Sequence, residues 1–124
     1  MICLDTNYLI RGLMTATEEA GRITRWLEQK EPISIPAVAW YEFLCGPVSD
    51  EEIQLAKVVL TAGVLAFFED EATEAARLFN AVKRKRAMRV DAMIAGTAIV
   101  ARARLATRNR ADFKPFTAHG LTLA

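Results

Sequence analysis

The sequence predicts an α/β fold, a three-layer α/β/α sandwich with a short, mostly parallel central sheet. Short apolar runs alternate along the chain with helical segments, and strands separated by helices usually pair in parallel. These runs are continuously apolar, as in sheets that are covered on both faces. The length of 124 residues suits one compact core, so we expect a single domain over residues 1–124.

Five apolar segments are expected to form the strands of this sheet. Each is bounded by a helical segment or by Gly or Pro, and none is long enough to be a helix of typical length. The predicted strands are residues 1–4, 33–35, 64–68, 105–107 and 121–123.

Six helices are expected between these strands, and several have clear start or stop signals. Pro36 begins a helix that Gly46 and Pro47 end. Ser49 and Glu52 form a capping-box pattern at the start of the next helix, and Gly63 is its expected C-terminal glycine. The predicted helices are residues 6–13, 18–29, 36–45, 50–61, 70–86 and 91–101.

Composition excludes several protein classes. No apolar run approaches the roughly 20 residues that cross a bilayer, and Asp5 and Arg11 interrupt the N-terminal stretch that a signal peptide would need. Cys3 and Cys45 are too few for a disulfide framework, so we expect both to be reduced packing residues. These features predict a cytoplasmic globular protein with no membrane association.

Four acidic residues are placed as a metal site would place them. Asp5 ends the first apolar run, Glu42 interrupts an apolar helical stretch, and Asp91 opens a helix of small apolar residues. Asp112 follows the fourth strand, and the carboxyl ends of strands are where sites form in such sheets. Asp5, Glu42 and Asp91 have no Lys or Arg at helical i±3 or i±4 positions.

Carboxylates in such surroundings either take up protons or bind a cation. Two of them about 5 Å apart repel by roughly 3 kcal/mol at an effective dielectric of about 20. An oxygen-only set of ligands points to Mg²⁺ or Mn²⁺, and carboxylate-bound ions of this kind typically serve phosphoryl chemistry. The chain has no P-loop and no Gly-rich dinucleotide fingerprint.

Basic residues are clustered although the net charge is only +1. One cluster comprises Lys83, Arg84, Lys85, Arg86 and Arg89, and a second comprises Arg102, Arg104, Arg108 and Arg110. Basic clusters close to carboxylates suit an anionic substrate that approaches a metal. The alternative for residues 83–86 is that they complement the C-terminal dipole of a helix.

Other α/β families that begin with an aspartate fit less well. A haloacid-dehalogenase-like phosphatase would have a second acidic residue two positions after Asp5, where this chain has Asn7. A receiver domain would have an acidic pair at the end of its first strand, and Asp5 stands alone. A non-catalytic binding module would be indicated by a missing acidic position, and all four are present.

Four segments of the chain, in order, resemble the motifs of a PIN domain, and most closely those of VapC toxins from toxin–antitoxin systems. They are Cys3–Ile10, Ile35–Pro36 with Tyr41–Gly46, Val90–Ala95 and Leu105–Phe113. The resemblance implies a Mg²⁺- or Mn²⁺-dependent endoribonuclease whose four acidic positions are Asp5, Glu42, Asp91 and Asp112.

The resemblance also implies roles for individual residues. Asp5, Asp91 and Asp112 are expected nearest the metal, with Glu42 acting more through water. Polar residues beside the site are expected to orient the carboxylates or the substrate: Asn7, Thr107 and Asn109. Basic residues are expected to bind RNA phosphates: Lys83, Arg84, Arg86, Arg89, Arg108 and Arg110.

The expected partners are an RNA substrate, a second copy of the chain in a homodimer, and a cognate antitoxin. Aromatic residues on short helices are the expected interface, because Tyr and Trp offer large apolar area with a polar atom: Tyr8, Trp26, Trp40 and Tyr41. For Trp26 and Trp40 a place in the core is an equal alternative. A housekeeping RNA-processing nuclease with the same catalytic residues remains the alternative to a toxin.

Overall fold

A five-stranded sheet forms the centre of the protein in a computed structural model that describes residues 1–124. All four strand pairings are parallel, in the order β3-β2-β1-β4-β5. The strands are β1 (Ile2–Leu4), β2 (Ile33–Pro36), β3 (Gly63–Leu65), β4 (Arg104–Ala106) and β5 (Thr122–Leu123). The predicted parallel sandwich is therefore confirmed, and the sheet is parallel throughout.

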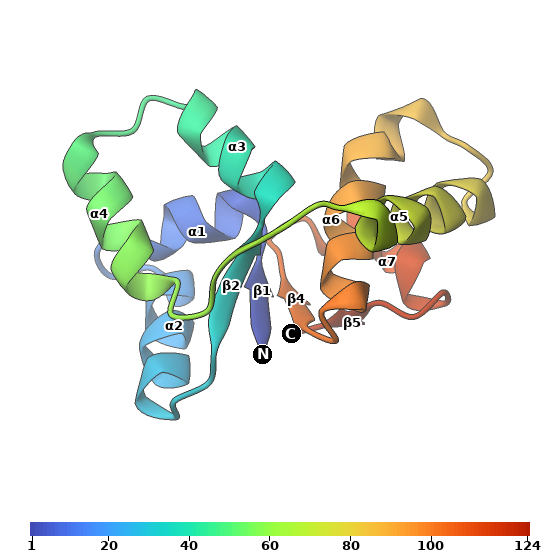
Figure 1. The fold of residues 1–124 in the computed structure, drawn as a ribbon. Helices are drawn as coiled ribbons and strands as arrows, with labels where there is room; N and C mark the ends of the chain where they lie inside the picture. The colour runs from blue at the N-terminus through green and yellow to red at the C-terminus, as the bar shows by residue number, and fades with distance from the viewer.

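Helices cover both faces of this sheet. The first four are α1 (Thr6–Gly12), α2 (Glu18–Glu28), α3 (Ala37–Cys45) and α4 (Asp50–Val59). The others are α5 (Glu69–Ala81), α6 (Arg89–Val100) and α7 (Arg110–Thr117), with one 3₁₀ turn, η1 (Arg86–Met88), before α6. In Figure 1, α1, α2 and α4 lie to the left of the sheet and α5, α6 and α7 to the right.

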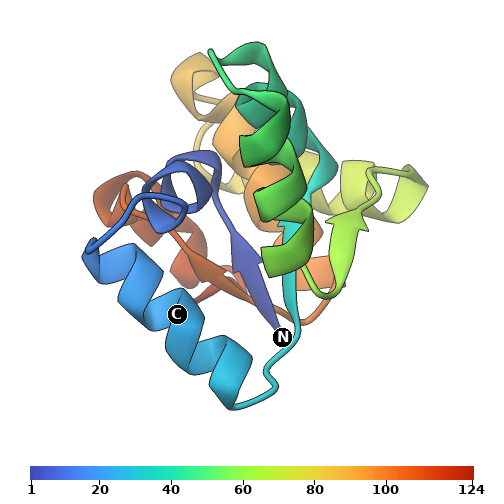
Figure 2. The same ribbon diagram turned by 90° about the vertical axis from the view of Figure 1, so that its left-hand side faces the viewer.

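The two helical layers follow from the strand order. From β1 the chain moves outward through β2 to β3, and it then crosses back to β4 and continues to β5 on the other side. Because crossover connections between parallel strands are right-handed, this reversal places α5–α7 on the face opposite α1–α4. Figure 2 views the first layer from outside, with α2 and α4 in front of the sheet.

Strand β1 and strand β2 are entirely buried, which explains their continuous apolar character. The largest fully buried side chains include Phe43, Phe113 and Phe116, and each contributes roughly 1.5–3 kcal/mol by leaving water. Helix α6 packs closely on α5 at Gly96, where an added Cβ would lie 2.8 Å from the backbone nitrogen of Ala75. The small residue at position 96 thus allows α6, the helix that carries Asp91, to pack closely on α5.

Several predicted boundaries differ from the structure. The expected helix 70–86 ends at Ala81, because Lys83 and Arg84 have the left-handed φ angles of 65° and 56°. The expected strand 64–68 ends at Leu65, and Phe68 is an exposed residue that precedes α5. Gly63 does not end α4; it begins β3 with a φ of 74°.

Helix α7 was not predicted at all. It begins at Arg110 and contains Pro115, which masks the helical pattern because proline is rare inside helices. Phe113 and Phe116 anchor it to the core. Asp112 therefore lies in the first turn of a helix and does not directly follow a strand end.

The capping box of Ser49 and Glu52 is present as predicted. Cys3 is a buried packing residue, and burial raises the pKa of its thiol to about 12. Cys45 is exposed, so its predicted packing role was wrong: it lies in the last turn of α3 on the side away from the core. None of the helices is long and apolar enough to cross a membrane.

Candidate active site

The candidate site lies at the carboxyl ends of β1 and β4, where the strand order reverses. Ligand sites in open parallel sheets form at such reversals, because the connections leave in opposite directions and open a crevice. Asp5 follows β1 directly, and its backbone N–H donates to the carbonyl of Ala106 in β4 over 2.9 Å. The side chain of Asp5 therefore starts at the boundary between the two halves of the sheet.

Hydrogen bonds to both oxygens fix the carboxylate of Asp5. Its Oδ1 accepts from the backbone N–H of Thr6 at 2.8 Å, which makes Asp5 the N-cap of α1. Its Oδ2 accepts from the hydroxyl of Thr107 at 2.9 Å. The Thr107 oxygen in turn accepts from the backbone N–H of Asn109 at 3.0 Å. Two loops that are about a hundred residues apart in sequence are thereby joined at one carboxylate.

Burial raises the pKa of Asp5, which is only 5% exposed. The hydrogen bonds from Thr107 and Thr6 oppose this shift, and the negative charge of Asp112 adds to it. No Lys or Arg forms an ion pair with Asp5, since all ion pairs in the molecule involve other acids. Asp5 is thus a buried carboxylate that hydrogen bonds hold and no cation neutralises.

Glu42 reaches the same site from α3. The hydroxyl of Thr6 donates to its Oε1 at 3.1 Å and is also within 3.1 Å of the carbonyl of Ala39. Glu42 itself is exposed, whereas we had expected apolar neighbours to enclose it. Thr6 therefore links the two acidic residues, with its backbone on Asp5 and its side chain on Glu42.

Asp91 lies half-buried in the first turn of α6. Its pKa is raised from 3.8 to about 6, first by burial and then by the negative charges of Asp5, Asp112 and Glu42. All three of the other predicted acidic residues thus act on Asp91, and no basic residue is among the causes. The structure brings the four predicted carboxylates into one electrostatic environment.

Asp112 completes this group from α7. It is exposed, and its backbone N–H donates to the carbonyl of Asn109 at 3.0 Å. Asp91 and Asp112 line the same surface hollow of about 310 Å³, together with Ala87, Met88, Ala111 and Pro115. The hollow connects the carboxylates to the turn between α5 and α6.

The donor set fits a hard divalent cation in type. All four groups are carboxylates, and the hydroxyls of Thr6 and Thr107 flank them. No three acidic, histidine or cysteine side chains are close enough together to ligate one ion directly. Mg²⁺ keeps several waters and binds through one or two carboxylates, so it does not require three direct protein ligands.

The first basic cluster is exposed and unpaired. No acidic group forms an ion pair with Lys83, Arg84, Lys85, Arg86 or Arg89. The guanidinium of Arg89 lies 5.6 Å from the centre of the Phe79 ring, which orients it on the surface. The cluster follows the C-terminus of α5, where the backbone N–H of Arg84 donates to the carbonyl of Phe79 at 2.9 Å, so complementing the dipole of α5 stays an alternative for Lys83 and Arg84.

Arg108 and Arg110 differ from that cluster. Arg108 forms an ion pair with Glu19 of α2 at 3.0 Å. Arg110 donates to the backbone carbonyl of Ala124 at 2.8 Å. Arg108 is therefore already engaged by an acid, and only Arg110 keeps its charge unpaired.

The residues predicted to orient the site behave differently from one another. Thr107 contacts Asp5 directly, and Asn109 acts through its backbone. Asn7 is exposed and makes no side-chain hydrogen bond within the protein. Sequence reasoning missed Thr6, which touches two of the acids, although its position next to Asp5 at a helix start was an available signal.

Two of the four predicted interface aromatics belong to the core. Tyr8 and Trp26 are 3% and 7% exposed, so they offer no free surface to a partner. Trp40 is half-buried and stacks on Phe43 with ring centres 5.3 Å apart. Only Tyr41 is widely exposed, at 68%.

A protein-family model, the PIN domain, matches residues 2–116. Among solved structures, a chain of the DNA-bound VapBC complex from Salmonella typhimurium is similar, with 18% identity, a TM-score of 0.77, and coverage of 99% of this chain and 96% of that one. A chain of the promoter-DNA-bound VapBC2 complex from Rickettsia felis shows 19% identity and a TM-score of 0.74, over 100% and 98% of the two chains.

A chain of a toxin–antitoxin complex from Klebsiella pneumoniae shares 27% identity, with a TM-score of 0.65 over 91% of this chain and 90% of that one. No curated protein sequence matches the chain. The family match spans every residue of the acidic site, and the similar structures share the fold over nearly the full length. The chain belongs to the PIN domain family.

Proposed function

We propose that the protein is a Mg²⁺- or Mn²⁺-dependent endoribonuclease that hydrolyses phosphodiester bonds in RNA. One observation carries this proposal: Asp91 has a pKa raised first by burial and then by the charges of Asp5, Asp112 and Glu42, and none of the four acids has a basic partner. Such a group is unfavourable without a cation and becomes a catalytic centre with one. Membership of the PIN domain family supports the same activity.

In this proposal Asp5, Asp91 and Asp112 hold the ion, directly or through water, and Glu42 contacts it through water. When bound, the ion supplies a water nucleophile and neutralises the charge that develops at phosphorus. Thr107 and Thr6 hold Asp5 in one orientation, so that no side chain has to reorganise during the reaction. Glu42 accepts a hydrogen bond from the Thr6 hydroxyl, and its carboxylate is also available to take a proton from water.

The basic cluster of residues 83–89 is proposed to bind the RNA backbone. It borders the hollow that contains Asp91 and Asp112, since Ala87 and Met88 line that hollow. An anionic strand held there would pass over the carboxylates, which repel it unless a cation is bound. Binding of the strand and binding of the ion therefore support each other.

The test is cleavage of a generic single-stranded RNA by the purified protein with Mg²⁺, with Mn²⁺ and with EDTA. We expect cleavage only with a metal, and none from Asp5→Asn. Cleavage in EDTA, or equal cleavage by Asp5→Asn, would contradict the assignment. RNA binding without any cleavage under all three conditions would support a non-catalytic binding module.

We further propose that the protein is the toxin of a toxin–antitoxin pair. The similarity to a chain of the Klebsiella toxin–antitoxin complex supports this role. An antitoxin would inhibit by placing an Arg or Lys at the unpaired carboxylates, since that cation relieves the same repulsion as the metal. The test is co-purification with the product of the neighbouring gene, and relief of inhibition when one basic residue of that product is removed. No association would favour a housekeeping RNA-processing nuclease.

A homodimer is also proposed. Exposed apolar side chains on α3 and α4 offer a surface for a second copy or for the antitoxin, and this surface replaces the buried Tyr8 and Trp26 of the predicted interface. Its members are Tyr41, Leu44, Leu55 and Val58. Light scattering at micromolar concentration is the test, and a monomer would contradict the proposal.

A further inference from the structure

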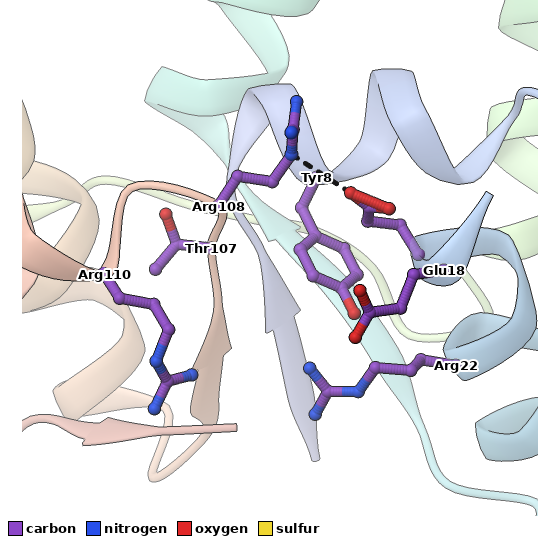
Figure 3. A pocket seen from close by; sticks show the side chains of 7 residues that line it. Tyr8, Glu18, Arg22, Thr107, Arg108 and Arg110 are labelled. Atoms are coloured by element: carbon purple, nitrogen blue, oxygen red, sulfur yellow. Dashed lines mark ion pairs between the residues drawn. The ribbon is translucent and has the colours of Figure 1, made fainter.

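A polar pocket of about 240 Å³ lies beside the acidic site, between the first two helices and the start of α7. Figure 3 shows Tyr8 of α1, Glu18 and Arg22 of α2, and Thr107 and Arg110 around it. Five of its seven lining residues are charged, so it is not a gap in the apolar core. Its chemistry is therefore that of a binding site for a polar ligand.

Two of the charged lining residues neutralise each other. Glu19 is buried and accepts from Arg108 at 3.0 Å, with Arg11 at 3.8 Å from the same oxygen. Neither Arg22 nor Arg110 forms an ion pair with an acid. Arg110 uses one N–H group on the carbonyl of Ala124, and the remaining N–H groups of both guanidinium groups can bind negative or carbonyl oxygens.

Aromatic rings hold one of these guanidinium groups in place. The guanidinium carbon of Arg22 lies 4.9 Å from the ring centre of Trp26 and 5.9 Å from that of Tyr8. Figure 3 shows its end directed toward the space below the Tyr8 hydroxyl. A planar cation that is already oriented loses less side-chain entropy when it binds a ligand.

The hydroxyl of Tyr8 is buried and has no hydrogen-bond acceptor within normal distance; burial raises its pKa, and the nearby guanidinium of Arg22 opposes that shift. In Figure 3 the side chains of Glu18 and Arg22 extend toward this hydroxyl from α2. An unpaired buried hydroxyl is unfavourable by roughly 1–3 kcal/mol. A ligand group that enters between the exposed Glu18 and the half-buried Arg22 would satisfy it.

Glu18 adds an acceptor to this set of donors. A phosphate alone would be repelled by its carboxylate, whereas a nucleobase offers N–H groups to it as well as carbonyl or ring-nitrogen acceptors to arginine. Single-stranded RNA is recognised through such base edges together with phosphate contacts. The mixture of donors and acceptors therefore favours a nucleotide over a simple anion.

The pocket and the acidic site share a wall. Thr107 lines the pocket, and its hydroxyl donates to Asp5. Tyr8 lies three residues after Asp5 in the chain, about one helical turn or roughly 5 Å along α1. An RNA strand advances by one to two nucleotides over that distance, at about 3.4 Å per stacked nucleotide.

We propose that this pocket binds a nucleotide next to the scissile phosphate. Arg22 and Arg110 bind its phosphate or carbonyl oxygens, Glu18 accepts from the N–H groups of its base, and the Tyr8 hydroxyl donates to it. The inference rests on the proposed nuclease function for the role of the nucleotide, but binding itself needs neither metal nor cleavage.

The test is titration of the purified protein in EDTA with each nucleoside 5′-monophosphate, with the nucleosides and with inorganic phosphate. Tryptophan fluorescence reports binding, because Arg22 lies on the ring of Trp26. We expect at least one nucleotide to bind more tightly than phosphate or any nucleoside. Arg22→Ala and Arg110→Ala should each weaken that binding about tenfold, the effect of losing a hydrogen bond to a charged group.

Matched variants separate the pocket from general charge effects. Arg25→Ala, on the same helix but outside the pocket, should bind like the wild type. Tyr8→Phe keeps the ring in the core and removes only the hydroxyl, and Glu18→Gln should change the ranking of the four bases. Should Arg22→Ala unfold, Arg110→Ala still tests the same ligand from another helix.

Three outcomes would overturn the proposal: no nucleotide binding, equal binding of inorganic phosphate, or nucleotide binding that all pocket variants leave unchanged. Pocket variants that weaken only antitoxin binding would assign the surface to a protein partner and would also overturn it. Failure of RNA cleavage, with nucleotide binding intact and dependent on Arg22 and Arg110, would refute the nuclease function and leave the pocket standing.

Discussion

Two buried carboxylates near Thr107, those of Glu19 and Asp5, show how a fold can use the same group differently. Glu19 and Asp5 are 8% and 5% exposed, so both are removed from water. Glu19 is neutralised by Arg108 at 3.0 Å, whereas Asp5 receives only hydroxyl and amide hydrogen bonds. The ion pair of Glu19 with Arg108 joins α2 to the loop after β4. The hydrogen bonds of Asp5 leave negative charge at the carboxyl end of β1.

The difference teaches that the partner of a buried acid, rather than its burial, indicates its role. An acid paired with arginine loses its attraction for a cation and stabilises the structure that holds it. An acid surrounded by other acids retains that attraction. The pKa of Asp91 is raised for this reason, first by burial and then by the charges of the other acids. On this basis we propose that Glu19 stabilises the fold and that Asp5, Asp91, Asp112 and Glu42 form the proposed catalytic site.

The largest expected effect is the loss of activity in Asp91→Asn. Removing one charged group from the proposed site should lower RNA cleavage by at least about a hundredfold. Its thermal midpoint should stay the same or rise, because repulsion from Asp5, Asp112 and Glu42 is relieved. The exposed Asp70→Asn on α5 is the control, and wild-type cleavage by Asp91→Asn would remove it from the site.

Glu19→Gln should give the opposite pattern, a loss of stability rather than a loss of cleavage. It leaves Arg108 without its partner near a partly buried site, and we expect a loss of about 2 kcal/mol in the free energy of unfolding. Urea denaturation measures this loss, with the exposed Glu28→Gln on the same helix as control. If Glu19→Gln kept full stability and lost all cleavage, the contrast between the two acids would be wrong.

Neutralising the basic cluster with the triple variant of Lys83, Arg84 and Arg86 to alanine should weaken RNA binding about tenfold. The salt dependence should flatten by about 0.7 in the log–log slope for each phosphate contact that is lost. Binding isotherms at several salt concentrations measure both quantities. An unchanged slope would mean that these residues, although unpaired, do not meet the RNA backbone.

The smallest expected effect concerns pH. The folded-state pKa of Asp91 is about 6 and its ordinary value is 3.8, so the unfolded chain loses this proton first. The contribution of Asp91 to stability is therefore fully present below about pH 4. It is lost as the pH rises through about 6, and above that it no longer changes. Because Asp91 is only half-buried, we expect this loss in the free energy of unfolding to be only about 1 kcal/mol.

Denaturation of chelator-treated protein between pH 4 and pH 8 measures this decline. Asp91→Asn should show less of it than the wild type. A wild-type protein whose stability rises steadily over the same range would show that the carboxylates are not mutually repelling. Adding Mg²⁺ at pH 8 should raise the thermal midpoint of the wild type more than that of Asp91→Asn.

Much of the fold was predictable because its determinants are local. Short apolar runs and helical periodicity identified all five strands and six of the seven helices, and the capping box at Ser49 is formed within four residues. The failures were also local in origin. Pro115 hid α7, and the left-handed backbone at Lys83 and Arg84 ended α5 early, although neither residue is a glycine.

Three of the four acids, Asp5, Glu42 and Asp91, stand out in the sequence because no Lys or Arg lies one helical turn away. Asp112 has Arg108 four positions before it, yet in the fold none of the four acids forms an ion pair. Their orientation could not be predicted, since Thr6 and Thr107 act on them through contacts that sequence spacing does not reveal. For the same reason Arg108 was expected to bind RNA: its partner Glu19 is 89 positions away in the chain.

The sequence by itself determined the alternation of strands and helices, the four acids and the unpaired basic cluster. Only the tertiary structure decided the strand order that brings Asp5 next to Thr107, the pairing of Glu19 with Arg108, and the pocket between α2 and α7. The physical reason is that helix and strand formation depend on neighbours in the chain. Coulomb interactions and hydrogen bonds depend instead on distance in space, which the packing of the sheet and helices sets.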